Sequence, residues 1–215
     1  MDDFGCRAHV ILYRGNILER LHYYHEETSV GRPAKFSQDQ ILDAALAIAA
    51  EDGLGAATVA AIAARVGAPT GSLYHRFGSH DLLLAALWIR TVRSFQRGFV
   101  EALVAGDAEM AALHTPMWCR QHPAEAALLL LHRRQELAAG WPVELGEDLE
   151  TLNTQVSDAL SSYAARHPGV DRERLIFATV DVPYGAVRRY LLEGRPPPPL
   201  VDGLITSVCR AVLPL

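Results

Sequence analysis

The sequence has few cysteines and no long apolar run. Its three cysteines, Cys6, Cys119 and Cys209, are an odd and widely spaced set. Such a set does not suit a disulfide framework and fits the reducing cytoplasm. No apolar run approaches the roughly 18 residues that a membrane helix needs, and the first 30 residues contain no apolar core of a secretory signal. We therefore expect a cytoplasmic protein with no membrane partner.

The net charge and the absence of several motifs exclude further classes of protein. The chain carries 20 Lys or Arg against 25 Asp or Glu, a net charge of −5 at pH 7. This excludes a protein whose whole surface is basic and binds nucleic acid, but it allows a local region that binds nucleic acid. There is no phosphate-binding glycine loop, no GxSxG elbow and no HExxH motif, so we expect no enzyme and no cofactor. His114, Cys119, His122 and His132 lack the partners of a metal site, and none is expected.

Composition changes near residue 31. Residues 1–30 contain a single alanine and three of the seven tyrosines, whereas the rest of the chain is alanine-rich and has Lys35 as the only lysine. From Ser37 onwards, apolar residues recur at helical spacing, with almost no strand-like alternation. We therefore predict an all-α protein with an N-terminal extension (residues 1–30), a three-helix head (31–78) and a larger helical body (79–215).

Local start and stop signals divide these regions into helices. Ser37 and Thr58 are predicted N-caps in the head, and Gly53, Gly67 and Gly78 are predicted to end its three helices. In the body, helices are expected over residues 79–106, 108–121, 124–139, 143–166, 171–193 and 200–213, separated by proline and glycine.

Residues 59–78 have the spacing of a helix-turn-helix. Ala63 supplies a small side chain where two helices cross. Gly67 lies in the turn, where a positive φ suits glycine, and Leu73 returns to the core. The apolar seam is completed by Ile62, Val66 and Phe77. In an alanine-rich chain this pattern alone is a moderate signal.

The flanking residues make the signal specific. Four segments follow one another at set spacings: Gly31-Arg32-Pro33-Ala34-Lys35, Ile41-Leu42-Asp43-Ala44-Ala45, Thr58-Val59 and Gly71-Ser72-Leu73-Tyr74-His75-Arg76-Phe77. Over about residues 31–85 the chain resembles the DNA-binding head of TetR-family transcriptional regulators, and the likeness extends more loosely over the body. The resemblance implies a homodimer that binds double-stranded operator DNA.

The resemblance also implies roles for individual residues, with the helix over residues 69–77 entering the major groove. Thr58 and Tyr74 match phosphate contacts. The base-facing positions are Thr70, Gly71, Ser72 and His75. Arg32 and Lys35 match a basic arm. His80 stands where the family commonly has lysine, so that phosphate contact is expected to be weaker or pH-dependent.

The charge of the head supports this interpretation only slightly. Residues 31–105 carry seven Lys or Arg and six Asp or Glu, whereas residues 106–215 carry ten and fourteen. DNA affinity must then come from a few placed contacts, doubled by dimerisation. The alternatives are an activator, a regulator controlled by a protein partner, or a ligand-binding adaptor whose head no longer binds DNA.

For the body, the resemblance implies an apolar pocket that holds a small-molecule effector. The predicted lining is Trp88, Val92, Phe95, Met117, Trp118, Leu129 and Val156; the alternative is that these residues are simple core. The two last helices should pair with those of a second copy. The predicted interface is Val182, Gly185, Ala186, Val187, Leu191, Leu204 and Val208. We expect a repressor of a palindromic operator that a small apolar or amphipathic molecule releases; the sequence identifies neither that molecule nor the operator.

Overall fold

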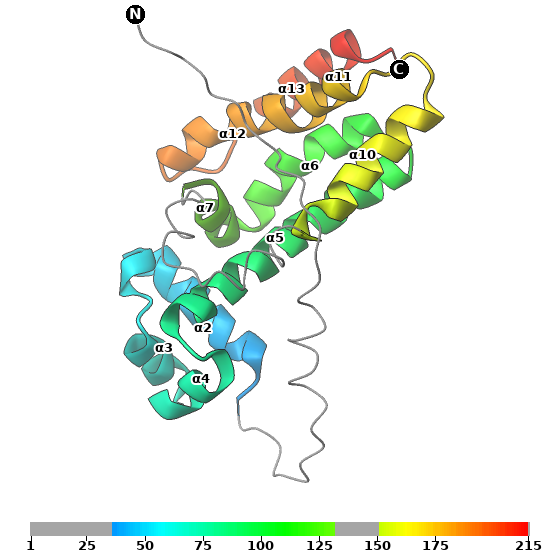
Figure 1. Ribbon diagram of the computed structural model, residues 1–215. Coiled ribbons are helices and arrows are strands. Elements are labelled where there is room, and N and C mark those ends of the chain that lie inside the picture. Colours follow the sequence, from blue (N-terminus) through cyan, green and yellow to red (C-terminus); the bar gives the residue numbers. More distant parts are fainter. Residues whose placement is uncertain (1–35, 132–150, 215) are drawn as a thin grey trace, which may run out of the picture.

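The fold is a small helical head joined to a longer helical body (Figure 1). The computed structural model describes residues 36–131 and 151–214. All regular elements in these two ranges are helices, which confirms the predicted all-α class.

Helices of the head begin and end at the predicted residues. The head contains α2 (Gln38–Asp52), η1 (Leu54–Ala56), α3 (Val59–Val66) and α4 (Thr70–Phe77). The backbone N–H groups of Gln40 and Ala61 donate to the hydroxyls of Ser37 and Thr58, at 3.1 and 3.2 Å, as N-caps do. Gly67 ends α3 in the left-handed conformation, with φ 75°, as predicted. The short 3₁₀ turn η1 was not predicted, because three residues give no periodicity.

The body is built around one long helix. Its elements are α5 (His80–Val104), α6 (Ala108–Gln121), α7 (Pro123–Leu131), α10 (Thr154–Arg166), α11 (Arg172–Ile176), η3 (Phe177–Asp181), α12 (Val182–Leu192) and α13 (Leu200–Val212). Helix α5 starts in the head and runs diagonally to the far end of the body (Figure 1). The parts of the predicted helices that fall on residues 132–139 and 143–150 lie outside the described residues.

A π-helical segment interrupts the helix predicted over residues 171–193. In η3 the N–H of Val182 donates to the carbonyl of Phe177, five residues earlier. Pro183 follows at the start of α12, and proline has no N–H for the carbonyl four residues before it. The wider π turn accommodates this missing bond. Helix α6 also carries an internal proline, Pro116.

Helices α5 and α6 cross closely at a glycine. A Cβ added at Gly98 would lie 2.5 Å from Cε1 of His114, so only glycine fits there. Nε2 of His114 donates to the carbonyl oxygen of Phe95 at 2.7 Å. Burial lowers the pKa of His114, which keeps the imidazole neutral while it links the two helices.

The core of the head continues beyond residue 78. Its buried side chains come from α2, α3 and α4, and also include Leu83 and Leu87 of α5 and Leu128 of α7. A separate core fills the body between α5, α6, α10, α12 and α13. The head is therefore packed directly onto two helices of the body.

Candidate functional site

Helix α4 presents a polar outer face. Its two apolar anchors, Leu73 and Phe77, are buried in the core of the head. The side chains on its other face are exposed: Thr70, Gly71, Ser72, Tyr74, His75 and Arg76. Tyr74 is 52% exposed although it is aromatic, and a Cβ added at Gly71 would meet no atom within 4 Å. This face is therefore open to a large partner and includes all five predicted DNA-contacting residues of the helix.

Two arginines, Arg65 in the head and Arg90 in the adjoining helix α5, are already paired with acids. Arg65 binds Glu51 through two bonds of 2.9 and 2.5 Å, and Arg90 lies 2.8 Å from Asp43. Arg76, on the exposed face of α4, has no ion pair within the described residues. The free positive charge of the head is thus small, in agreement with the sequence.

His80 serves an internal role that the sequence did not reveal. Its Nε2 lies 2.8 Å from the carbonyl oxygen of Ala57 and donates to it. The imidazole therefore ties the start of α5 to the turn before α3, and this nitrogen is not free for a phosphate. Thr58 is exposed and uses its hydroxyl as the α3 cap. Arg32 and Lys35 lie outside the described residues.

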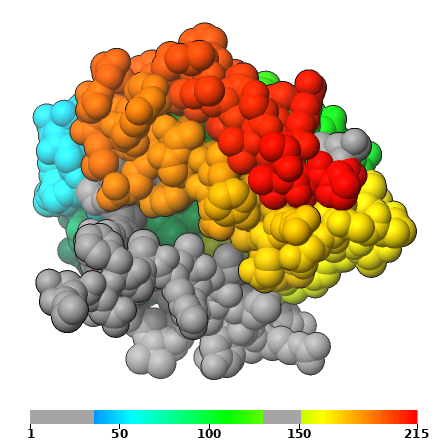
Figure 2. All heavy atoms as spheres, turned by 90° about the horizontal axis from the view of Figure 1, so that it is seen from above, coloured from blue at the N-terminus to red at the C-terminus, as the bar shows by residue number. Residues whose placement is uncertain are grey.

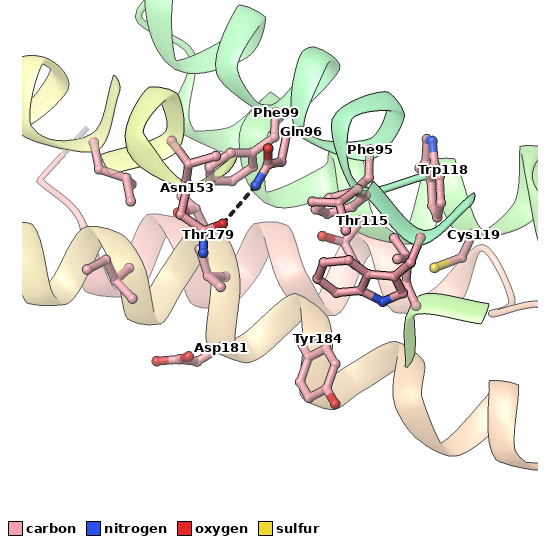
Figure 3. A pocket seen from close by; sticks show the side chains of 17 residues that line it. Phe95, Gln96, Phe99, Thr115, Trp118, Cys119, Asn153, Thr179, Asp181 and Tyr184 are labelled. Carbon is pink, nitrogen blue, oxygen red and sulfur yellow. Dashed lines mark hydrogen bonds between the residues drawn. The ribbon is translucent and has the colours of Figure 1, made fainter. Parts of the chain in front are cut away.

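The body encloses a cavity of about 390 Å³ between α5, α6, α7, α10 and η3 (Figure 3). Six of the seven side chains predicted for the pocket line it: Trp88, Val92, Phe95, Trp118, Leu129 and Val156. Met117 does not line it, because Thr115, Trp118 and Cys119 form the inner face of α6. Trp118 meets Phe95 edge to face, with ring centroids 5.2 Å apart, which builds an aromatic end of the cavity.

Besides further apolar residues such as Phe99 and Leu160, six polar side chains line this cavity. They are Gln96, Thr115, Asn153, Thr179, Asp181 and Tyr184. Sequence reasoning missed all six, because they come from separate helices and form no motif. The one signal was Pro183, which marks the irregular segment that carries Thr179 and Asp181. Burial, together with the nearby Glu173, raises the pKa of Asp181.

Cys119 of the cavity wall is chemically quiet. Burial raises the pKa of its thiol to about 12, and a protonated thiol is a poor nucleophile and a poor metal ligand. Within residues 36–131 and 151–214, no three His, Cys, Asp or Glu side chains are grouped to hold a metal ion. None of the helices in those ranges is both long and apolar enough to cross a membrane.

Helices α12 and α13 form an outer face of the body (Figure 2). Leu192, Leu200 and Leu204 are more than half exposed there. Gly185 and Gly203 leave open space above the backbone. Two ion pairs, Arg120–Asp202 and Arg210–Glu109, hold α13 on α6 and so orient the apolar face outward.

For two residues of α12, the prediction that they lie in the dimer interface is wrong. Val187 and Leu191 are buried inside the chain, packed with Trp118, Cys119 and Ala126. They lie on the inner side of α12, so they stabilise the protomer. Val182, Ala186 and Val208 are partly buried, whereas Gly185 and Leu204 are exposed as predicted.

Comparisons with known proteins agree with this architecture. Residues 41–87 match the family model of bacterial regulatory proteins, tetR family. No curated protein sequence matches the chain. A crystal structure of a transcriptional regulator from Rhodococcus sp. Rha1 has a TM-score of 0.62 at 19% identity, covering 82% of this chain and 96% of that one.

Two further solved structures have the same fold. The multidrug binding protein EbrR complexed with imidazole has a TM-score of 0.57 at 17% identity, covering 85% of this chain and 97% of that one. The fatty acid degradation regulator FadR from Bacillus halodurans has a TM-score of 0.55 at 19% identity, covering 83% and 98%. The match lies on the helix-turn-helix head, and the solved structures share the fold of head and body: residues 41–87 form a head similar to that of bacterial regulatory proteins of the tetR family.

Proposed function

We propose that this protein is a transcriptional regulator of the tetR family: a cytoplasmic, homodimeric repressor that binds a palindromic operator and is released by a small molecule in the cavity. The outer face of α4 reads the major groove, and Tyr74 and Thr58 bind phosphates. The exposed leucines of α12 and α13 meet those of a second copy, since an apolar patch of this kind marks an interface.

The observation that carries this proposal is a double contact between cavity and head. On α5, Leu87 lies in the core of the head while the adjacent Trp88 lines the cavity. On α7, Leu128 lies in that same core while the adjacent Leu129 lines the cavity. A molecule that displaces Trp88 or Leu129 therefore moves helices on which the head is packed.

A movement of the two heads is sufficient to release DNA. Two recognition helices related by a two-fold axis must meet major grooves about 34–36 Å apart. A ligand that favours another tilt of α5 disfavours that spacing, and coupling of about 1–3 kcal/mol changes operator affinity by about 5- to 150-fold. EbrR, complexed with imidazole, supports the view that bodies of this fold hold small molecules.

The test starts from DNA that the protein itself selects. Random duplexes are enriched on the purified protein, and the selected site is titrated at several salt concentrations by fluorescence anisotropy. We expect a palindromic site bound by two chains, with affinity that falls steeply as salt rises. Binding without sequence preference, or by one chain per site, would contradict the proposal.

Substitutions of Tyr74 and His75 are expected to affect DNA binding in different ways. Tyr74→Phe removes a hydroxyl that reaches phosphate, so affinity should fall about equally for the selected operator and for unrelated DNA. His75→Ala should instead change which bases are preferred, with a discrimination loss of about 1–3 kcal/mol at one position. Anisotropy titrations against single-base operator variants measure both effects, and exchanged behaviour of the two variants would overturn these roles.

Gly71→Ala should make the protein more stable and a weaker DNA binder. Gly71 lies in α4 with open space around it, so alanine should raise the free energy of unfolding by about 0.5–1 kcal/mol. The added methyl group stands where a base edge must approach. The control is Gly67→Ala, where φ is 75° and alanine should destabilise the head. Undiminished operator affinity of Gly71→Ala would show that this residue does not face the bases.

A further inference from the structure

One end of the cavity carries an amide pair with unused hydrogen-bonding capacity. Nε2 of Gln96 donates to Oδ1 of Asn153 at 2.9 Å (Figure 3). This bond leaves Oε1 of Gln96 as an acceptor and Nδ2 of Asn153 as a donor, with no other hydrogen bond to a residue that the structure describes. A ligand group that both donates and accepts would complete the pair.

Thr115 adds a hydroxyl to the wall of the same cavity. It is only 5% exposed and lines the cavity, yet its hydroxyl has no hydrogen-bond partner among the described residues. The other two buried threonines differ, because the hydroxyls of Thr91 and Thr179 donate to the carbonyls of Leu87 and Leu175 at 2.8 and 2.7 Å. The Thr115 hydroxyl therefore keeps its capacity to donate to or accept from a molecule in the cavity that Thr115 lines.

The other side chains of the cavity wall restrict the shape and the charge of a ligand. Trp88, Phe95 and Trp118 add flat apolar faces to the wall, and Phe95 and Trp118 lie at the opposite end from Asn153 (Figure 3). Among the described residues that line the cavity, none is Lys or Arg, and Asp181 carries the one carboxyl group. A negatively charged ligand would find no counter-charge among these residues, and burying an unpaired charge is costly.

We propose that the cavity selects a flat, uncharged molecule with an apolar body and one group that both donates and accepts hydrogen bonds, such as a primary amide. Gln96 and Thr115 set this preference, and anionic amphiphiles are rejected. The inference rests on the proposed function, since it takes this cavity as the effector site.

The test compares four probes with one ring system. 2-Naphthamide, 2-naphthoate and 2-ethylnaphthalene are titrated into the full chain by equilibrium dialysis. We expect 2-naphthamide to bind at least about tenfold more tightly than either of the others, since two or more hydrogen bonds distinguish it from the hydrocarbon. The fourth probe is 2-(aminomethyl)naphthalene, which is positively charged at pH 7. It should also bind more weakly than the amide.

Two matched threonine variants assign the effect to Thr115. Thr115→Val removes the unpartnered hydroxyl and should weaken 2-naphthamide by about fivefold to tenfold, with no change for 2-ethylnaphthalene. Thr91→Val makes the same substitution at a buried threonine that does not line the cavity and whose hydroxyl already donates to the carbonyl of Leu87, so amide affinity should be unchanged. Gln96→Leu should likewise lower the preference for the amide over the hydrocarbon.

The outcomes separate this inference from the proposed function. Equal affinity for amide and hydrocarbon, tightest binding of the ammonium probe, or equal effects of Thr115→Val and Thr91→Val would overturn the inference and leave the cavity a ligand site. Failure of all four probes to bind at millimolar concentration would overturn both.

Discussion

Leu204→Glu should convert the protein to a monomer that no longer holds its operator. Leu204 is 55% exposed in the middle of the apolar face of α13. Across a two-fold axis each substitution is present twice, so two unpaired carboxylates would be buried at the contact. Since one head contacts only a half-site, operator affinity should fall on the order of 10²-fold or more. Sedimentation velocity should give the mass of one 23.5 kDa chain.

The matched control is Met110→Glu. Met110 is a second exposed apolar residue, at 43%, but it lies in the first turn of α6, where a negative charge is favourable. This variant should remain dimeric and bind DNA normally. If both variants dissociate, or if the unaltered chain sediments as a monomer at micromolar concentration, the face formed by α12 and α13 is not the dimer contact.

Trp118→Ala should be strongly destabilising. Trp118 is 4% exposed and packs against Phe95, Val187 and Leu191 as well as lining the cavity. Its removal enlarges an existing void, which costs about 3–5 kcal/mol. For a domain of this size the melting temperature should fall by roughly 6–20 °C, as measured by circular dichroism.

Tyr184→Ala provides the comparison at the same cavity. Tyr184 also lines it but is 42% exposed, so the loss should stay within about 1 kcal/mol. A Trp118→Ala protein that melts as late as the Tyr184→Ala protein would show that Trp118 contributes nothing to the core. It would then belong to the ligand site alone.

Local signals were enough to predict the head. Ser37, Thr58 and Gly67 each act within a few residues of their own position, through a side-chain cap or a positive φ. The apolar spacing that places Leu73 and Phe77 in the core is local too. Features of this kind need no knowledge of the remaining chain, so pattern and structure agree there.

In the body, local sequence patterns were not enough to predict which residues pack together. Periodicity identified Val187 and Leu191 as apolar, but it does not distinguish a partner within the chain from a second copy of the chain. Met117 neighbours Trp118 in sequence, yet it lies on another side of α6. Gln96, Thr115 and Asn153 meet only because three helices pack together, and no spacing in the sequence encodes that meeting.

The shared core of the head limits its modularity. Leu83, Leu87 and Leu128 complete the packing around Ile62 and Leu73, although they belong to α5 and α7. A chimaera joined directly after α4 would give the transplanted head foreign side chains at these three places. This head is therefore expected to be transferable only together with the first turns of α5 and a compatible α7. On the proposed function, a change of operator in evolution should be easier by point substitution on α4 than by exchange of the whole head.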